Sequence, residues 1–289
     1  TGTVTIGENA TINSANLQEY VAASEHDLTN HASAKGGAAV GITDTVTENR
    51  LNINNTVDVK DGAALSNEKA ATTEDIRLAA YDDLNLNSHA DSTVGGAVGV
   101  LVSKNETTMN RTSNVNVAGT IGSASNANLY AGADEDGALS NLNVDLKAAV
   151  YNYTAIPISP PTVNYNIVAD KGTVDVSGTV RSTRDINAIA SSGKESVVKD
   201  ETKWAWVTGG KTINKKFLSS NAVSAEETSS EMKASGVNVT GTMIAGTADP
   251  ISVTIKGSVA DGLIVEGPDN LANQRVKSGI TGGTFDYAS

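Results

Sequence analysis

The chain has 289 residues and a net charge of −12, from 33 acidic and 21 basic residues, with no cysteine and only 4% aromatic residues. The absence of cysteine excludes disulfides, thiol catalysis and cysteine metal sites. The negative charge disfavours nucleic acid as a partner, because phosphate binding needs a basic surface, and it disfavours binding to anionic membranes by simple electrostatics. No apolar run approaches the roughly 20 residues that cross a bilayer, so we expect no membrane span.

A short strand-like phrase recurs five times along the chain. Its copies are Val4-Thr5-Ile6-Gly7, Val57-Asp58-Val59 with Gly62 after it, Val115-Asn116-Val117-Ala118-Gly119, Val174-Asp175-Val176-Ser177-Gly178 and Val237-Asn238-Val239-Thr240-Gly241. The leading valines follow one another at nearly equal intervals. A period of roughly 60 residues predicts one structural unit copied in tandem.

Within the units, apolar and polar residues alternate with a period of two, as in Leu142-Asn143-Val144-Asp145-Leu146. This alternation predicts short strands with one buried face, and Val117 and Val176 should point inward. We expect an all-β fold, a right-handed parallel β-helix or β-solenoid built from these repeats. At roughly 20 residues per turn, one unit would form three turns, and about 14 turns would give an axis of about 70 Å. The alternative is an array of small β-sandwiches.

We expect residues 1–289 to form a single solenoid of five repeats that start near Val4, Val57, Val115, Val174 and Val237. Two stretches interrupt the pattern and are predicted to loop out of the stack. Residues 151–165 contain three of the five prolines, and residues 192–235 are polar and charged. The second stretch holds both tryptophans, Trp204 and Trp206, which could instead cover one face of the stack.

Two glycine-rich boxes add a further repeated landmark. They are Gly36-Gly37-Ala38-Ala39-Val40-Gly41-Ile42 and Gly95-Gly96-Ala97-Val98-Gly99-Val100. With the Val-Asn-Val and Val-Asp-Val strand starts, these boxes make the chain resemble the filamentous-haemagglutinin-like family of bacterial exoproteins and its leukotoxin-like filamentous relatives. The resemblance implies a right-handed parallel β-helix shaft, secretion through an outer-membrane partner, and display at the cell surface. It brings no catalytic residue with it.

The three histidines, His26, His31 and His89, do not predict a metal site, since the spacing of the first two suits neither a strand nor a helix. The sequence has no Gly-x-Ser-x-Gly elbow and no phosphate-binding glycine loop. We therefore assign no catalytic, cofactor-binding or metal-binding residue, and we expect no cofactor.

The acidic clusters Asp82-Asp83 and Asp134-Glu135-Asp136 are the strongest candidates for an enzyme, because they occupy similar places after Ile76 and Leu129. At three turns per unit they would be roughly 14 Å apart, whereas glycosidase carboxylates are about 5 to 9.5 Å apart. We interpret them as solvated acids at corners of the fold. A surface calcium site at the second cluster is the alternative.

These observations predict a non-enzymatic structural shaft of a secreted bacterial adhesin or extracellular surface fibre. Its expected partners are a host or neighbouring cell surface and further copies of itself, joined end to end or laterally. The alternative is a β-helix lyase or hydrolase that acts on polysaccharide, which would require convergent Asp, Lys and Arg side chains on adjacent turns.

Overall fold

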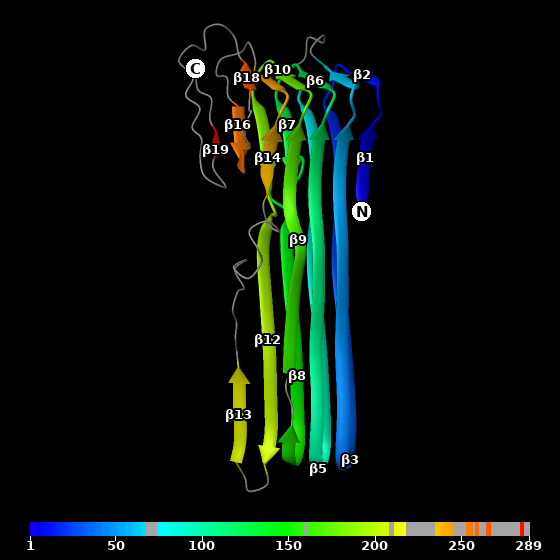
Figure 1. Ribbon diagram of the computed structural model, residues 1–289, viewed down its shortest axis with the longest axis vertical. Helices are drawn as coiled ribbons and strands as arrows, with labels where there is room; N and C mark the ends of the chain where they lie inside the picture. Colours follow the sequence, from blue (N-terminus) through cyan, green and yellow to red (C-terminus); the bar gives the residue numbers. More distant parts are fainter. Residues whose placement is uncertain are drawn as a thin grey trace.

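The computed structural model describes residues 1–67, 74–158, 161–207, 211–217, 235–245, 253–256, 258–259, 264–266 and 284–285. The regular elements of these residues are all strands, and most pair in parallel (Figure 1). No helix long and apolar enough to cross a membrane occurs among them. The predicted all-β parallel solenoid built from tandem repeats is confirmed.

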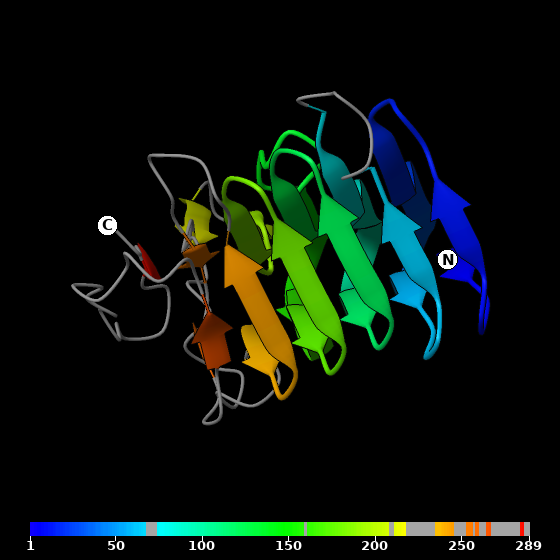
Figure 2. The same cartoon turned by 90° about the horizontal axis from the view of Figure 1, so that it is seen from above.

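One repeat forms one coil, and successive coils stack directly on each other (Figure 2). The leading valines give the register, since Val4 pairs with Val57, Val57 with Val115, Val115 with Val174, and Val174 with Val237. The prediction of three turns per repeat, and with it about 14 turns along an axis of about 70 Å, is wrong. Five coils at about 4.8 Å per step give a stack only about 20 Å deep.

The coil is large because each repeat contains a long excursion, which we call the arm. In the second coil, β5 (Ile76–Val117) runs 42 residues outward and back again, and β3 (Gln18–Val59) does the same in the first. In the third coil β8 (Asn141–Ile158) forms the outgoing leg and begins the returning leg, and β9 (Pro161–Val176) forms the rest of the returning leg. The arms run from the upper part of Figure 1 to the turns at its lower end.

The remaining part of each coil forms the head. It includes a six-stranded sheet in the order β18-β15-β10-β6-β4-β2. The head strands are β1 (Gly2–Ile6), β2 (Thr11–Asn13), β4 (Ala64–Ser66), β6 (Thr120–Ser123), β7 (Ala127–Ala131), β10 (Thr179–Ser182), β11 (Ile186–Ala190), β14 (Gly236–Val239), β15 (Thr242–Ala245), β16 (Val253–Lys256), β17 (Ser258–Val259), β18 (Ile264–Glu266) and β19 (Thr284–Phe285).

The head core consists of aliphatic columns in which equivalent residues of successive coils lie over each other. Val59, Val117, Val176 and Val239 form one column, and each is at most 1% exposed. The inward direction predicted for Val117 and Val176 is therefore confirmed. Leu65, Ile121, Val180 and Met243 form a second column on the smaller sheet. Small β-branched residues suit this packing, because each side chain rests on its equivalent in the next coil.

The two legs of each arm belong to two layers that pack face to face. Next to the head the space between the layers is apolar, with Leu84, Leu86, Met109, Leu142 and Leu146 buried. Farther out it holds small polar side chains, with an apolar cluster of Val94, Leu101 and Val150 near the end of the arm. Ser92 Oγ donates to the carbonyl oxygen of Val102 at 2.8 Å, and Asn49 Nδ2 donates to Ser88 Oγ at 2.9 Å. Small residues let two sheets approach until a side chain reaches the backbone of the opposite layer.

The prediction that residues 151–165 loop out of the stack is wrong. Residues 151–158 continue β8, and residues 161–165 begin β9, both in register with the legs of β5. Pro157 at the end of β8 and Pro161 at the start of β9 lie on the returning leg, in register with Gly99 and Ser103 of the preceding coil. Of the second predicted loop, β12 (Lys194–Val207) extends the ladder beside β8, and β13 (Lys211–Phe217) pairs antiparallel with β12. Residues 208–210 and 218–234 lie outside the described residues.

Candidate functional site

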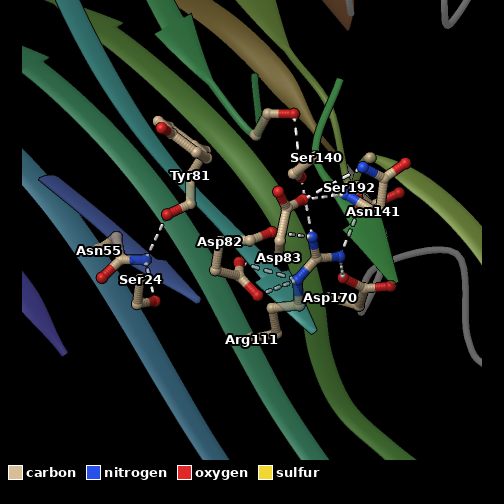
Figure 3. A network of polar contacts seen from close by, with 12 residues as sticks. Ser24, Asn55, Tyr81, Asp82, Asp83, Arg111, Ser140, Asn141, Asp170 and Ser192 are labelled. Carbon is tan, nitrogen blue, oxygen red and sulfur yellow. Dashed lines mark hydrogen bonds and ion pairs between the residues drawn. The ribbon is translucent and has the colours of Figure 1, made fainter. Parts of the chain in front are cut away.

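Ionisable side chains gather where the arm joins the head, around the buried guanidinium of Arg111 (Figure 3). Arg111 lies on the returning leg of β5, and Asp82 faces it from the outgoing leg of the same strand. Asp170 is the register partner of Arg111 on β9. Side-chain exposure is 3% for Arg111, 0% for Asp82 and 1% for Asp170, so this charge cluster is completely enclosed.

All three nitrogens of the guanidinium have acceptors. Nε donates to both carboxylate oxygens of Asp82, at 2.9 and 2.8 Å. Nη1 donates to Asp170 Oδ1 at 3.0 Å and to the carbonyl oxygen of Ser192. Nη2 donates to Ser140 Oγ at 2.8 Å and to the carbonyl oxygen of Asp82 at 3.2 Å. Arginine has five N–H donors in a fixed fork, and this fork holds together both legs of one coil and segments of the next.

Burial and charge act in opposite directions on these groups. Burial raises the pKa of Asp82, although the Arg111 charge and its hydrogen bonds act to lower it. Burial disfavours the Arg111 cation, but the attraction of Asp82 and Asp170 outweighs it, so the pKa of Arg111 rises above its ordinary value. The guanidinium is therefore always charged, and the carboxyl groups of Asp82 and Asp170 surround it. The prediction that Asp82 is a solvated corner acid is wrong.

A second buried polar contact lies beside this cluster in the first coil, and Figure 3 shows both. Asn55 is on the returning leg of β3 and is fully buried. Its Nδ2 donates to Ser24 Oγ on the outgoing leg at 2.7 Å and to the carbonyl oxygen of Tyr81 on the next coil at 2.6 Å. Asn55 thus fastens the legs of the first coil at the level where Arg111 fastens those of the second.

Asp83 points away from Asp82, as expected for neighbours on a strand, and reaches the outer face. Its Oδ1 accepts the backbone N–H of Asn141 at 2.6 Å. It lines an open groove of about 260 Å³ on that face. The lining residues are Glu25, His26, Asp27, Asp83, Leu84, Asn85, Asn141 and Asn143. The groove therefore offers three carboxylates and three amides, all from outgoing legs of the arms.

The carboxylates of this groove lie on adjacent coils. Glu25 is the register partner of Asp83, and Asp27 that of Asn85, whose Nδ2 donates to Asp27 Oδ1 at 3.1 Å. Neighbouring strands are about 4.8 Å apart, so acids one repeat apart can meet. The predicted separation of roughly 14 Å between equivalent acids one repeat apart is wrong, because one repeat makes one coil and not three turns.

The second acidic cluster is not equivalent to the first. Asp134, Glu135 and Asp136 lie in a turn between β7 and β8, which has no counterpart between residues 80 and 84 of the preceding coil. Asp134 Oδ1 accepts the N–H groups of Asp136 and Ala138 at 3.0 and 2.8 Å. Asp136 binds Arg77 at 3.0 Å. These carboxylates close the turn, and the described residues hold no group of three or more histidine and acidic side chains placed for a metal ion.

Two of the three histidines come together, which the sequence reasoning missed. His31 and His89 are register partners whose rings meet edge to face at 6.1 Å between centroids. His31 Nε2 lies 2.9 Å from Asp91 Oδ2. The separation of His31 and His89 along the chain could have predicted this pairing, because it equals the step from Val57 to Val115. His26 and His31 lie on one strand, so their spacing does not indicate this pairing.

Comparison of the chain with models of known protein families, with curated proteins and with solved structures found no match.

Proposed function

We propose that this chain is a non-enzymatic structural shaft of a secreted bacterial adhesin or extracellular surface fibre, which displays or mediates attachment. The supporting observation is the continuous parallel ladder in which each repeat adds one coil with the same columns of buried side chains. A ladder of this kind forms an extended body and presents a similar surface at each coil. The resemblance to filamentous-haemagglutinin-like proteins supports an extracellular location at the bacterial surface and an outer-membrane secretion partner.

The buried charges are consistent with a structural role. Arg111, Asp82 and Asp170 are enclosed and hydrogen-bonded to each other, so they face no substrate. A group that acts on a substrate must reach it within hydrogen-bonding distance. The most strongly held ionisable residues in the described part of the chain therefore maintain the fold.

Association between copies is part of the proposal. Residues 18–54 of β3 pair with β5 on one side, and no described strand pairs with their other side. An open strand edge is a template for pairing with a further strand. A further coil, from a longer polypeptide or from a second copy, would continue the ladder across this edge.

Attachment can be tested with beads coated with the purified chain and presented to epithelial and bacterial cells, with albumin-coated beads as the control. We expect the coated beads to bind at least one cell type well above the control. Failure to bind any surface, together with release of reducing sugar from a polysaccharide panel, would contradict the shaft proposal.

The groove at Glu25 and Asp83 favours a second candidate, an enzyme that cleaves polysaccharide. Register partners on adjacent strands bring their carboxylates near the separation of about 5 to 5.5 Å that retaining glycosidases use. The residues described as lining this groove include no Lys or Arg, so its substrate would be a neutral glycan. Sugar release by the wild-type chain that Glu25→Gln and Asp83→Asn each abolish, without a change in thermal stability, would establish this activity.

A further inference from the structure

The far end of the arm, which we call the tip, is apolar on its outer face in three successive coils. On the returning side, Val40 of β3, Val98 of β5 and Ile156 of β8 lie in one row across the sheet, and Ile42 and Val100 lie in the next row. Val40, Ile42 and Ile156 are 63%, 76% and 57% exposed. Exposed aliphatic side chains that gather in adjacent rows are typical of an interaction surface.

Aromatic residues lie on the other leg at the same end of the arm. Tyr153 is 49% exposed, and its ring contacts that of Trp204 with 4.4 Å between centroids. Trp206, two residues farther along β12, is the only other tryptophan of the chain. Tyrosine and tryptophan are enriched where an apolar phase meets water, because their rings are apolar and each has one polar group.

The tip is also free of charge in four successive coils. Among the described residues, the uncharged segments are 36–43, 92–103, 148–158 with 161–169, and 204–207. The charges that border them are Lys35, Asp44, Asp91, Lys104, Lys147, Asp170, Lys203 and Lys211. Five of these eight residues are lysines, although acids outnumber bases 33 to 21 in the whole chain.

Two of the three acids of this border are less available than the exposed lysines. Asp170 is buried against Arg111, and Asp91 is bound by His31. Lys35 and Lys104 are exposed, by contrast. Asp44 is therefore the one border acid for which the structure gives no ion pair among the described residues. Around the apolar tip, the local charge is positive.

From this arrangement we propose that the arm tip docks on a lipid bilayer with anionic headgroups. The aliphatic rows and aromatic rings would enter the interfacial region, and the lysines would extend their stems along the apolar surface toward the headgroup phosphates. The proposal rests on the attachment role given above and names a partner for it. A lipid surface fits better than a single receptor pocket because the tip repeats the same apolar rows from coil to coil.

Insertion must be shallow. Interfacial elements lie about 5 to 10 Å into the headgroup boundary, which corresponds to two or three residues of each leg. That depth covers the rows of Val40 and Ile42 and ends before Asp44. Deeper insertion would place the open backbone edge of β3 in hydrocarbon, where unpaired N–H and C=O groups are very costly.

The net charge of −12 does not prevent this docking, because the acids of the groove are distant from the tip. Asp83 and Gly96 lie on the same outgoing leg, and the stretch between them spans roughly 40 Å along the strand. The Debye length at physiological ionic strength is about 8 Å, so these acids are screened from the membrane.

The test uses co-sedimentation with vesicles of equimolar phosphatidylglycerol and phosphatidylcholine, and with vesicles of phosphatidylcholine alone. Both tryptophans lie in the tip segment of β12, so a blue shift of intrinsic fluorescence reports on insertion. The tip variant is Ile42→Ser, Val100→Ser and Ile156→Ser. Its matched control is Leu17→Ser, Leu28→Ser and Val198→Ser, which removes three exposed apolar side chains elsewhere.

We expect the wild type and the control to bind anionic vesicles with a blue shift, and the tip variant to bind about tenfold more weakly or worse. Lys35→Gln with Lys104→Gln should weaken binding to anionic vesicles and leave the fold unchanged by circular dichroism. The proposal is overturned if the wild type binds neither vesicle, or if the tip variant binds as well as the control. It is also overturned if the wild type forms dimers that the tip variant does not form, because the tip then binds a second copy.

Bead attachment to cells separates this proposal from the proposed function. If the tip variant still attaches to cells while the wild type ignores vesicles, the attachment role stands and the lipid partner is wrong. If neither protein attaches to any cell, the attachment role itself is wrong.

Discussion

Arg111 and Asp82 lie on opposite legs of one arm, 29 residues apart in the chain, and two hydrogen bonds of 2.9 and 2.8 Å join them. The pair closes the arm where it leaves the head, between the apolar core of the head and that of the arm. Because Arg111 also binds Asp170 on the next coil, this contact fixes both the hairpin shape of one coil and its register with its neighbour.

Replacing Arg111 by methionine should destabilise the fold by about 3 to 5 kcal/mol, because two carboxylates would remain buried without a compensating charge. The free energy of unfolding from urea titration measures this effect. Arg50→Met is the matched control, since the Arg50 side chain is 80% exposed and its loss should cost no more than about 0.5 kcal/mol. Equal costs for the two variants would contradict the role of the buried cluster.

Asp82→Ala and Asp83→Ala should differ strongly although the residues are adjacent. The first change leaves Arg111 buried with one carboxylate and should cost several kcal/mol. The second removes a partly exposed acceptor of one backbone N–H and should cost about 1 kcal/mol. Thermal denaturation of both variants measures the difference, and similar melting temperatures would show that Asp82 is not enclosed.

Asp82 should also make stability depend on pH in a specific direction. Its folded pKa is raised above the ordinary 3.8, so the folded state holds the proton more tightly than the unfolded state. The resulting stabilisation is present below about pH 3.8 and is lost as the pH rises through the folded pKa. Relative to Asp82→Asn, the wild type should therefore lose stability over that window in urea titrations at several pH values. A difference that stays flat or rises would refute the raised pKa.

Val117→Asp should damage the head locally. The new carboxylate would lie in the column between Val59 and Val176, at a cost of several kcal/mol. In a stacked array the loss spreads first to adjacent coils, because contacts are with nearest neighbours. Hydrogen exchange should accelerate first near residues 57–59 and 174–176, with the exposed Lys104→Asp as the control. Uniform acceleration through the whole chain would indicate a single cooperative globule.

The shape in solution should be a flat slab that is longest along the strands. One leg of about 20 residues spans roughly 66 Å, whereas five stacked coils span about 20 Å. In small-angle scattering, the maximum dimension should therefore equal the combined length of arm and head along the strands, and not the depth of the stack. A long thin rod, whose length grows with the number of coils, would contradict one coil per repeat.

The sequence predicted the repeat and its inward valines well, because a column of like residues needs the same residue type at each step. It did not predict that a repeat makes one coil. Strand-like residues occur on both sides of each glycine box, and a local pattern does not reveal that the strand turns back there. The prolines at residues 157–161 suggested a loop outside the ladder, whereas Pro157 and Pro161 are part of it.

The candidate site was harder to predict than the fold. Asp82 looks like any surface acid in the sequence, and nothing local marks Arg111 as its partner on the opposite leg. The offset from Arg111 to Asp170 equals the step from Val115 to Val174, and it could have placed those two side by side. The pairing across the arm, by contrast, depends on where each leg turns, which only the folded structure shows.

One coil per repeat also has a genetic consequence. Unequal recombination between neighbouring repeats would add or delete a whole layer, and the valines of a duplicated layer would meet copies of themselves. Such events change the number of layers without creating a mismatch inside any of them, so the gene can vary in copy number while every arm keeps its length. Selection on arm length would instead act on insertions beside the glycine boxes, and these must occur in every layer at once to keep the ladder in register.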